Sequence, residues 1–188
     1  MSLNGLKNSH KSISAYSSFD AEAMWQLYRE HGVIDFFCGK VSEEEFLRSF
    51  IKKHALPISV EEYMRAIREN FSLIEGTHAV VEELGRQGFP LALLSDHARE
   101  WAEFCEEKFG HHRYYRHVVY SFEVGYCKPS AAMFARALEL LGVEPEEALF
   151  IDDNPRNVEG AEKFGIPGIV FTDAPTLRRD LQSYGITL

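Results

Sequence analysis

Residues 147–156 read EALFIDDNPR, an apolar run that ends in two adjacent carboxylates. Leu149, Phe150 and Ile151 predict a short strand that is buried on both faces. Two carboxylates at the tip of such a strand are costly to bury unless a cation or hydrogen-bond donors lie opposite them. This stretch therefore predicts a buried strand and a positive group near its end.

Strands alternate with helices of about ten residues from Gly76 onward. The predicted strands are 90–94, 117–120, 149–151 and 168–171, and the predicted helices are 77–87, 99–109, 131–141, 156–164 and 177–184. This order is typical of a doubly wound parallel α/β sheet. We therefore expect a Rossmann-like α/β core.

The chain before this core has a helical pattern. Apolar residues recur at helical spacing between Asp20 and Gly32, and residues 42–45 and 59–62 are capping boxes that open two further helices. Residues 1–18 are rich in Ser, Asn and Lys, so we expect a flexible lead-in. The predicted organisation is a lead-in over 1–18, a helical segment over 19–73 and an α/β core over 74–188.

Composition narrows the class of protein. The 188 residues are 45% hydrophobic and carry a net charge of -9, without a dense run of Lys or Arg. We therefore expect a globular, cytoplasmic protein that binds no nucleic acid and no membrane. The three cysteines have no zinc-ligand spacing and are expected to be reduced thiols. The pair His111–His112 has no carboxylate or Cys at ligand spacing, which favours a solvated loop over a metal site.

Polar residues follow three of the predicted strands. Ser95 and Asp96 follow the first strand, Lys128 lies in the loop after the second, and Asp152 and Asp153 follow the third. Ligands of open α/β sheets bind beyond the carboxyl ends of the strands, so these groups should converge. The positive group that faces the carboxylates is then Lys128 or Mg²⁺, an ion that prefers oxygen ligands. A phosphate that binds among these residues would complete the site.

Each of these residues also has a structural interpretation. Ser95 could be a turn residue, Lys128 a solvated loop lysine, and Asp152 or Asp153 the cap of the helix near Pro155. Adjacent strand residues point to opposite faces, so the two carboxylates need not contact one ion. We expect Asp153 to be the closer metal ligand and Asp152 to orient Lys128 or a bound water.

Three segments resemble a known family. LALLSDHAR (91–99), VGYCKPSAAMF (124–134) and LFIDDNPRNVEGAEKFGI (149–166) resemble the second, third and fourth motifs of the haloacid dehalogenase-like (HAD) superfamily. The resemblance is to the branch that includes small sugar-phosphate phosphatases and the N-terminal phosphatase domain of soluble epoxide hydrolase. FFCGKVSEEEFLRSF (36–50) is similar to the helical cap of these enzymes.

The resemblance implies a Mg²⁺-dependent phosphatase scaffold for a small phosphorylated metabolite. Under it, Ser95, Lys128 and Asp152 are catalytic, Ser95, Asp96 and Lys128 surround the phosphate, and Asp153 with Asp152 holds Mg²⁺. The cap sequence does not reveal which metabolite is bound.

The first motif of the superfamily, a strand ending in a nucleophilic Asp, is not recognisable. We interpret Asp20 as a helix cap and Asp35 as part of the helical cap. The sequence could begin beyond the motif, the protein could be a pseudoenzyme that binds phosphate or metal, or Asp20 could act in an aberrant motif. Because the first strand is central in this superfamily, residues 11–16, direct closure of the neighbouring strands, or a second chain in a homodimer could fill its place.

Overall fold

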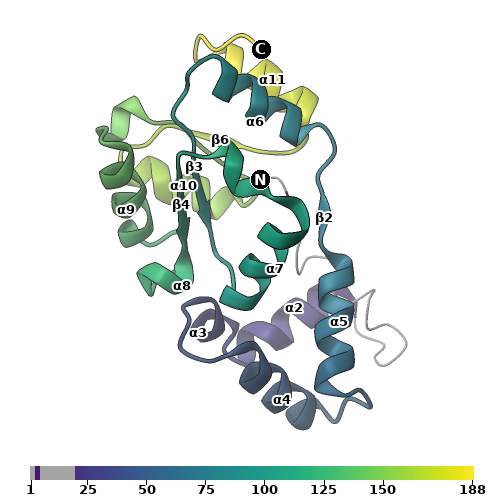
Figure 1. The fold of residues 1–188 in the computed structure, drawn as a ribbon. Helices are drawn as coiled ribbons and strands as arrows, with labels where there is room; N and C mark the ends of the chain where they lie inside the picture. Colours follow the sequence, from purple (N-terminus) through teal and green to yellow (C-terminus); the bar gives the residue numbers. More distant parts are fainter. Residues whose placement is uncertain (1–2, 5–19) are drawn as a thin grey trace.

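The computed structural model describes residues 3–4 and 20–188 (Figure 1). The lead-in expected over 1–18, and with it the strand candidate at 11–16, lies outside the described residues except for Leu3–Asn4. These two residues form β1, which pairs antiparallel with β2 (Ser72–Leu73).

Four helices form the segment predicted as a cap: α2 (Ala21–Glu30), α3 (Val33–Phe37), α4 (Glu43–His54) and α5 (Val60–Asn70). Both predicted capping boxes are confirmed, because Ser42 and Ser59 each exchange hydrogen bonds with the glutamate three residues later. The short helix α3 was not predicted.

The α/β core follows the predicted alternation. Its elements are α6 (Thr77–Arg86), β3 (Ala92–Ser95), α7 (Arg99–Phe109), the 3-10 helix η2 (His111–Tyr114), β4 (His117–Tyr120), α8 (Ser121–Val124), α9 (Ala131–Leu141), the 3-10 helix η3 (Pro145–Glu147), β5 (Phe150–Asp152), α10 (Pro155–Lys163), β6 (Gly168–Val170) and α11 (Ala174–Gln182). The short helix α8, which directly follows β4, was not predicted. The fold class is α/β with parallel strands, as expected.

The strands form two parallel pairs, β3 with β4 and β5 with β6. Among residues 3–4 and 20–188, no strand pairs with the inner edge of β3 or β5. Direct closure of β3 onto β5 is therefore wrong as an account of the missing first strand. Pairing with a second chain stays a prediction.

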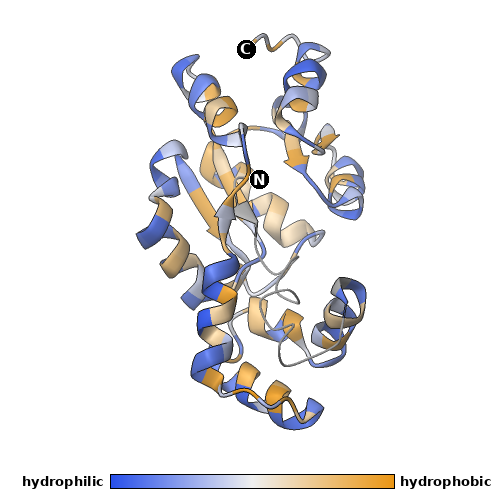
Figure 2. Ribbon diagram, turned by 90° about the vertical axis from the view of Figure 1, so that its right-hand side faces the viewer, coloured by the Kyte–Doolittle hydropathy of each residue, from blue (hydrophilic) through white to orange (hydrophobic). Residues whose placement is uncertain are grey.

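Hydrophobic residues lie along the strands and on one side of most helices (Figure 2). Helices α2–α5 share one buried cluster with α7, including Tyr28, Phe50, Tyr63 and Trp101. A second cluster joins α6, β6 and α11, and a third joins α9 and α10 to β3 and β5. Because α7 packs into the first cluster, the division at residues 73 and 74 stays a prediction.

The helices α2–α5 lie beside the carboxyl ends of β3 and β4, and α6 and α11 lie at the opposite end (Figure 1). Ser121, directly after β4, is fully buried, and its Oγ donates to the carbonyl of Phe37 at 2.6 Å. This hydrogen bond fixes α3 next to the strand ends. None of the described helices has the length and apolar run that a bilayer span requires.

Candidate functional site

Lys128 lies between the two strand pairs and contacts both. Its Nζ donates to the carbonyl of Leu94 in β3 at 3.1 Å and to Oδ2 of Asp152 in β5 at 2.6 Å. The Lys128 and Asp152 side chains are only 7% and 4% exposed. The positive group predicted to face the carboxylates of β5 is therefore present, and it is Lys128.

Asp152 has donors on both carboxylate oxygens. Besides Lys128 on Oδ2, its Oδ1 accepts from the backbone N–H of Asn154 at 2.8 Å and from Nδ2 of Asn157 at 3.1 Å. β5 ends one residue later than predicted, so Asp152 lies within the strand rather than after it. The three hydrogen bonds fix the carboxylate of Asp152. Asp153, which is half-buried, is the first residue after the strand.

The tip of β3 meets the Lys128 loop. Oδ1 of Asp96 accepts from the backbone N–H of Lys128 at 2.9 Å. Burial raises the pKa of the Asp96 carboxyl, and the Lys128 ammonium opposes this rise. Ser95 ends β3, is half-buried, and lies in the chain between Leu94 and Asp96, which both contact Lys128. The structure thus brings the tips of β3 and β5 to one lysine.

Local packing explains how the Lys128 loop is held. Asn154 caps α10 and Pro155 begins it, so α10 starts directly behind the tip of β5. At Gly160 in α10, an added Cβ would lie 2.3 Å from Cβ of Pro129. Only glycine lets the helix approach the loop this closely, and this contact places Lys128 against β5.

Three contributors to the site were not assigned a role from the sequence: the Leu94 carbonyl, Asn157 and Ser121. Asn157 is 7% exposed and fixes Asp152, and Ser121 accepts from the backbone N–H of His97 at 3.0 Å. Asn157 could have been found from its position in the fourth motif. Ser121 gave no signal beyond following a strand.

The two candidate nucleophiles lie elsewhere. Asp20 caps α2 by accepting from the N–H of Ala23 at 2.9 Å, which confirms the interpretation of Asp20 as a helix cap. Asp35 is in α3 and forms an exposed ion pair of 2.7 Å with Lys40. Among the described residues, Nζ of Lys128 donates to Leu94 and Asp152 and not to Asp20 or Asp35, so neither of these carboxylates completes the site as it stands.

Two cysteines lie beside the site. Sγ of Cys127, next to Lys128, is 3.6 Å from Sγ of Cys38, and both are free thiols. Burial raises the pKa of the Cys127 thiol, so little of the reactive thiolate forms at neutral pH. These cysteines are reduced in the structure, as expected.

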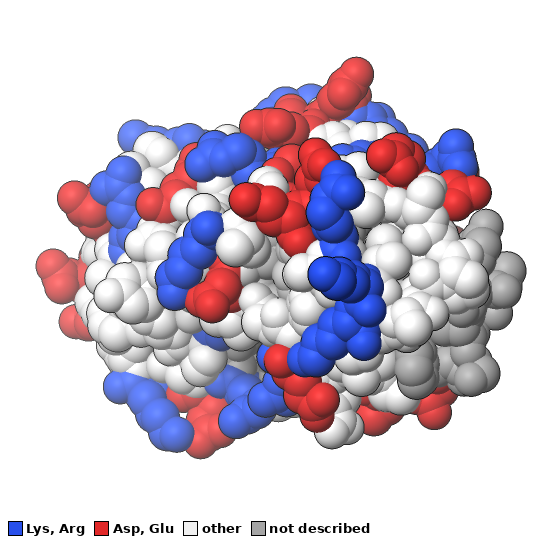
Figure 3. Space-filling view, turned by 90° about the horizontal axis from the view of Figure 1, so that it is seen from below, with Lys and Arg blue, Asp and Glu red and all other residues white. Residues whose placement is uncertain are grey.

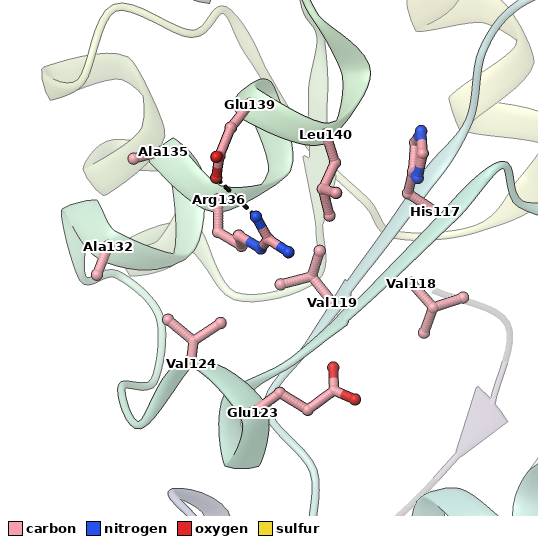
Figure 4. Close-up of a pocket in the computed structure, with 10 residues that line it drawn as sticks. All are labelled: His117, Val118, Val119, Glu123, Val124, Ala132, Ala135, Arg136, Glu139 and Leu140. Atoms are coloured by element: carbon pink, nitrogen blue, oxygen red, sulfur yellow. Dashed lines mark hydrogen bonds and ion pairs between the residues drawn. The ribbon is translucent and has the colours of Figure 1, made fainter.

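A groove of about 840 Å³ runs along the outer edge of β4 beside α9 (Figure 4). Its lining mixes apolar and charged side chains, with one ion pair between Arg136 and Glu139. None of the five predicted site residues lines it. On the face seen from below, Lys and Arg are interspersed with Asp and Glu, so no single sign of charge dominates that face (Figure 3).

Comparison with known proteins identifies the family of this chain. A model of the family described as haloacid dehalogenase-like hydrolase matches residues 3–171. The chain belongs to this HAD-like hydrolase family. The buried lysine between two strand ends, and the acidic pair that follows the third predicted strand, are thus features of a HAD-like chain.

Curated relatives of this HAD-like chain include phosphate-ester hydrolases. It is 28% identical over 155 residues to flavin mononucleotide hydrolase 1 of Arabidopsis thaliana, covering 82% of this chain and 62% of that protein. It is 29% identical over 154 residues to phosphoserine phosphatase of Thermus thermophilus, covering 79% and 62%. The chain therefore spans about three fifths of the length of these two relatives.

Solved structures support the fold. A HAD family enzyme from Bacteroides thetaiotaomicron superposes with a TM-score of 0.76 at 16% identity, covering 92% of this chain and 89% of that one. The same enzyme in complex with magnesium and inorganic phosphate gives a TM-score of 0.73 at 17% identity, covering 91% and 88%. A predicted HAD-like hydrolase from Porphyromonas gingivalis gives 0.73 at 24% identity, covering 97% and 92%.

Proposed function

We propose that this HAD-like chain is a Mg²⁺-dependent phosphatase scaffold for a small phosphorylated metabolite. The observation that carries the proposal is the buried Lys128, which spans from the Leu94 carbonyl to Asp152 at the strand tips. A buried ammonium in this place supplies a fixed positive charge to an anion that enters from the strand ends. The phosphatase relatives and the phosphate complex of a structural neighbour support this reading.

In this proposal each residue has a separate part. Ser95 would donate its hydroxyl to the phosphoryl group, Lys128 would stabilise the charge on its oxygens, and Asp152 would hold Lys128 in place. Asp96 accepts from the Lys128 backbone, so it would set the path of the loop rather than contact the phosphate directly. Helices α2–α5 would select the metabolite, because they lie beside the strand ends.

The candidate metal ligands at this edge of the sheet are carboxylate oxygens, which suit Mg²⁺. Asp152 already accepts three hydrogen bonds, so Asp153 would be the main carboxylate ligand and waters would complete the shell. When bound, the ion would neutralise part of the phosphate charge.

The test is a phosphatase assay on a panel of small phosphomonoesters, with and without Mg²⁺. We expect Mg²⁺-dependent turnover that falls by about 10²–10³-fold in Lys128→Met and in Asp153→Asn. Lys163→Met is the matched control, because that lysine is exposed and pairs with Glu159 on its own helix. Turnover that is equal in the parent and the two site variants would contradict the proposal.

The positions of Asp20 and Asp35 favour a second candidate function, in which the site binds phosphate and Mg²⁺ without turning over. Both carboxylates are engaged elsewhere, as a helix cap and as a surface ion pair. Calorimetric titration with Mg²⁺ and inorganic phosphate separates the two functions. Binding that Lys128→Met abolishes, in a chain that hydrolyses no ester of the panel, supports the binding role, and the absence of any binding excludes both functions.

A further inference from the structure

A second group of metal-ligating side chains lies where α7 meets η2. It consists of Glu106 near the end of α7 and of His111 and His112 at the start of η2. The expected solvated loop at the histidine pair is wrong for His111, whose side chain is only 3% exposed. The carboxylate that appeared to be missing is Glu106, because the chain reverses at Gly110, which has a φ of 56°.

The distances match the coordination sphere of a small divalent ion. Nδ1 of His111 is 3.2 Å and Nδ1 of His112 is 3.6 Å from Oε2 of Glu106. One ligand atom from each residue can be chosen so that all three lie within 4.8 Å of one another. Ligands about 2.0–2.1 Å from a tetrahedral Zn²⁺ are roughly 3.3–3.4 Å apart, so the two nitrogen–oxygen distances correspond to edges of such a tetrahedron.

The outer nitrogens of both rings face one hydroxyl. Nε2 of His112 is 2.8 Å and Nε2 of His111 is 3.5 Å from the hydroxyl oxygen of Tyr120. A hydrogen bond on the far nitrogen fixes the ring and leaves the other nitrogen to the metal, which is how metal-binding histidines are commonly held. Tyr120 therefore directs the two Nδ1 atoms toward Glu106.

His111 also has an unsatisfied atom in this cluster. Its Nδ1 is buried and forms no hydrogen bond of good geometry with any of the described residues. Oε2 of Glu106 lies 3.2 Å from this atom, and the backbone of Cys105 is close enough to influence the pKa of the ring. Buried polar atoms are rarely left in this state, and a metal ion is one way to satisfy them. The atom faces the carboxylate with which it would share the ion.

We propose that Glu106, His111 and His112 bind a Zn²⁺ ion. Two imidazoles and one carboxylate suit Zn²⁺ and related transition metals rather than Mg²⁺, which prefers oxygen ligands only. Three protein ligands leave a fourth position for water, and Glu106 and His112 are each 35% exposed, so the ion has access from solvent. The ion would fasten the end of α7 to η2. None of the three ligands belongs to the Lys128 network, so the site is independent of the proposed phosphatase.

The test is calorimetric titration of the chelator-stripped full chain with Zn²⁺ alone, in a buffer with excess Mg²⁺. We expect one Zn²⁺ per chain, and affinity lowered by about 100-fold or more in Glu106→Gln and in His112→Asn. Asp153→Asn and His54→Asn are the controls, and both should bind like the parent. Circular dichroism confirms that each variant is folded, and Glu106→Gln keeps an acceptor for the His112 backbone N–H.

A second readout is thermal unfolding. Zn²⁺ at about 100 times the parent's dissociation constant should raise the Tm of the parent by about 5 °C or more and that of Glu106→Gln by no more than about 1–2 °C. No Zn²⁺ binding by the stripped parent overturns the proposal. So does binding that is lost in Asp153→Asn and kept in Glu106→Gln, because the ion would then occupy the strand-tip site.

Discussion

His97, at the tip of β3, is held neutral by its surroundings. Its ring stacks on Phe71 with centroids 5.6 Å apart and meets Trp101 and Tyr120 edge-on. Burial lowers the pKa of His97 from 6.5 to about 4. The unfolded chain therefore takes up a proton near pH 6.5, whereas the folded chain resists it until about pH 4. The stabilisation is complete above pH 6.5 and is lost as the pH falls toward 4.

The expected loss of unfolding free energy from His97 is up to about 3 kcal/mol between pH 7 and pH 4. Urea denaturation of the parent and of His97→Gln across this range measures it. The variant should lose less stability on acidification than the parent. Burial also lowers the pKa of His111, so part of the acid sensitivity should persist in both proteins. Parallel pH profiles for the two proteins would show that His97 does not carry the effect.

At the scale of single residues, the sequence predicts contacts best between residues that lie at the carboxyl ends of neighbouring strands. The meeting of Lys128 with Asp152 could be predicted, because the loop after β4 and the end of β5 lie at the same edge of parallel strands. Two kinds of contact were not predicted: contacts between residues far apart in the sequence and contacts made by a single tight turn. Hydrophobic periodicity reveals neither kind. Ser121 contacts Phe37 across 84 positions, and Glu106 meets His111 only because the chain turns back at Gly110.

At the scale of elements, α10 and the Lys128 loop depend on one glycine. In Gly160→Ala the new Cβ would lie 2.3 Å from Cβ of Pro129, so helix or loop must move. We expect the free energy of unfolding to fall by about 1–3 kcal/mol. Gly85→Ala in α6 is the matched control, since a Cβ there meets nothing within 4 Å and should stabilise the helix by about 0.5–1 kcal/mol. Equal midpoints in urea for the two variants would contradict this argument.

Most elements could be predicted because their signals are local. Capping boxes fixed the starts of α4 and α5, and β4, α7 and α9 have the predicted bounds. The five-residue α3 was missed because it is too short to show a helical period. The short β5 was displaced by one residue, since a continuous apolar run does not mark where a strand ends.

At the scale of the whole molecule, Glu43 connects the helical segment to the core. This residue of α4 is 1% exposed and accepts from both terminal nitrogens of Arg68 in α5, at 2.7 and 2.6 Å. It also accepts from the indole N–H of Trp101 in α7 at 2.6 Å. Since α7 begins shortly after the tip of β3, this network ties the helices beside the site to the strand that carries Ser95.

Glu43→Ala should therefore destabilise the protein strongly. It leaves the buried indole N–H of Trp101 and the Arg68 guanidinium without their acceptor, and removing one partner of a buried charge pair costs about 3–5 kcal/mol. The neighbouring Glu44→Ala is the control, because Glu44 forms an exposed pair with Arg48 on the same helix and should change stability by less than about 1 kcal/mol. The urea midpoints of the two variants and the parent measure the difference. If Glu43→Ala is no less stable than Glu44→Ala, the Glu43 network does not hold the helical segment to the core.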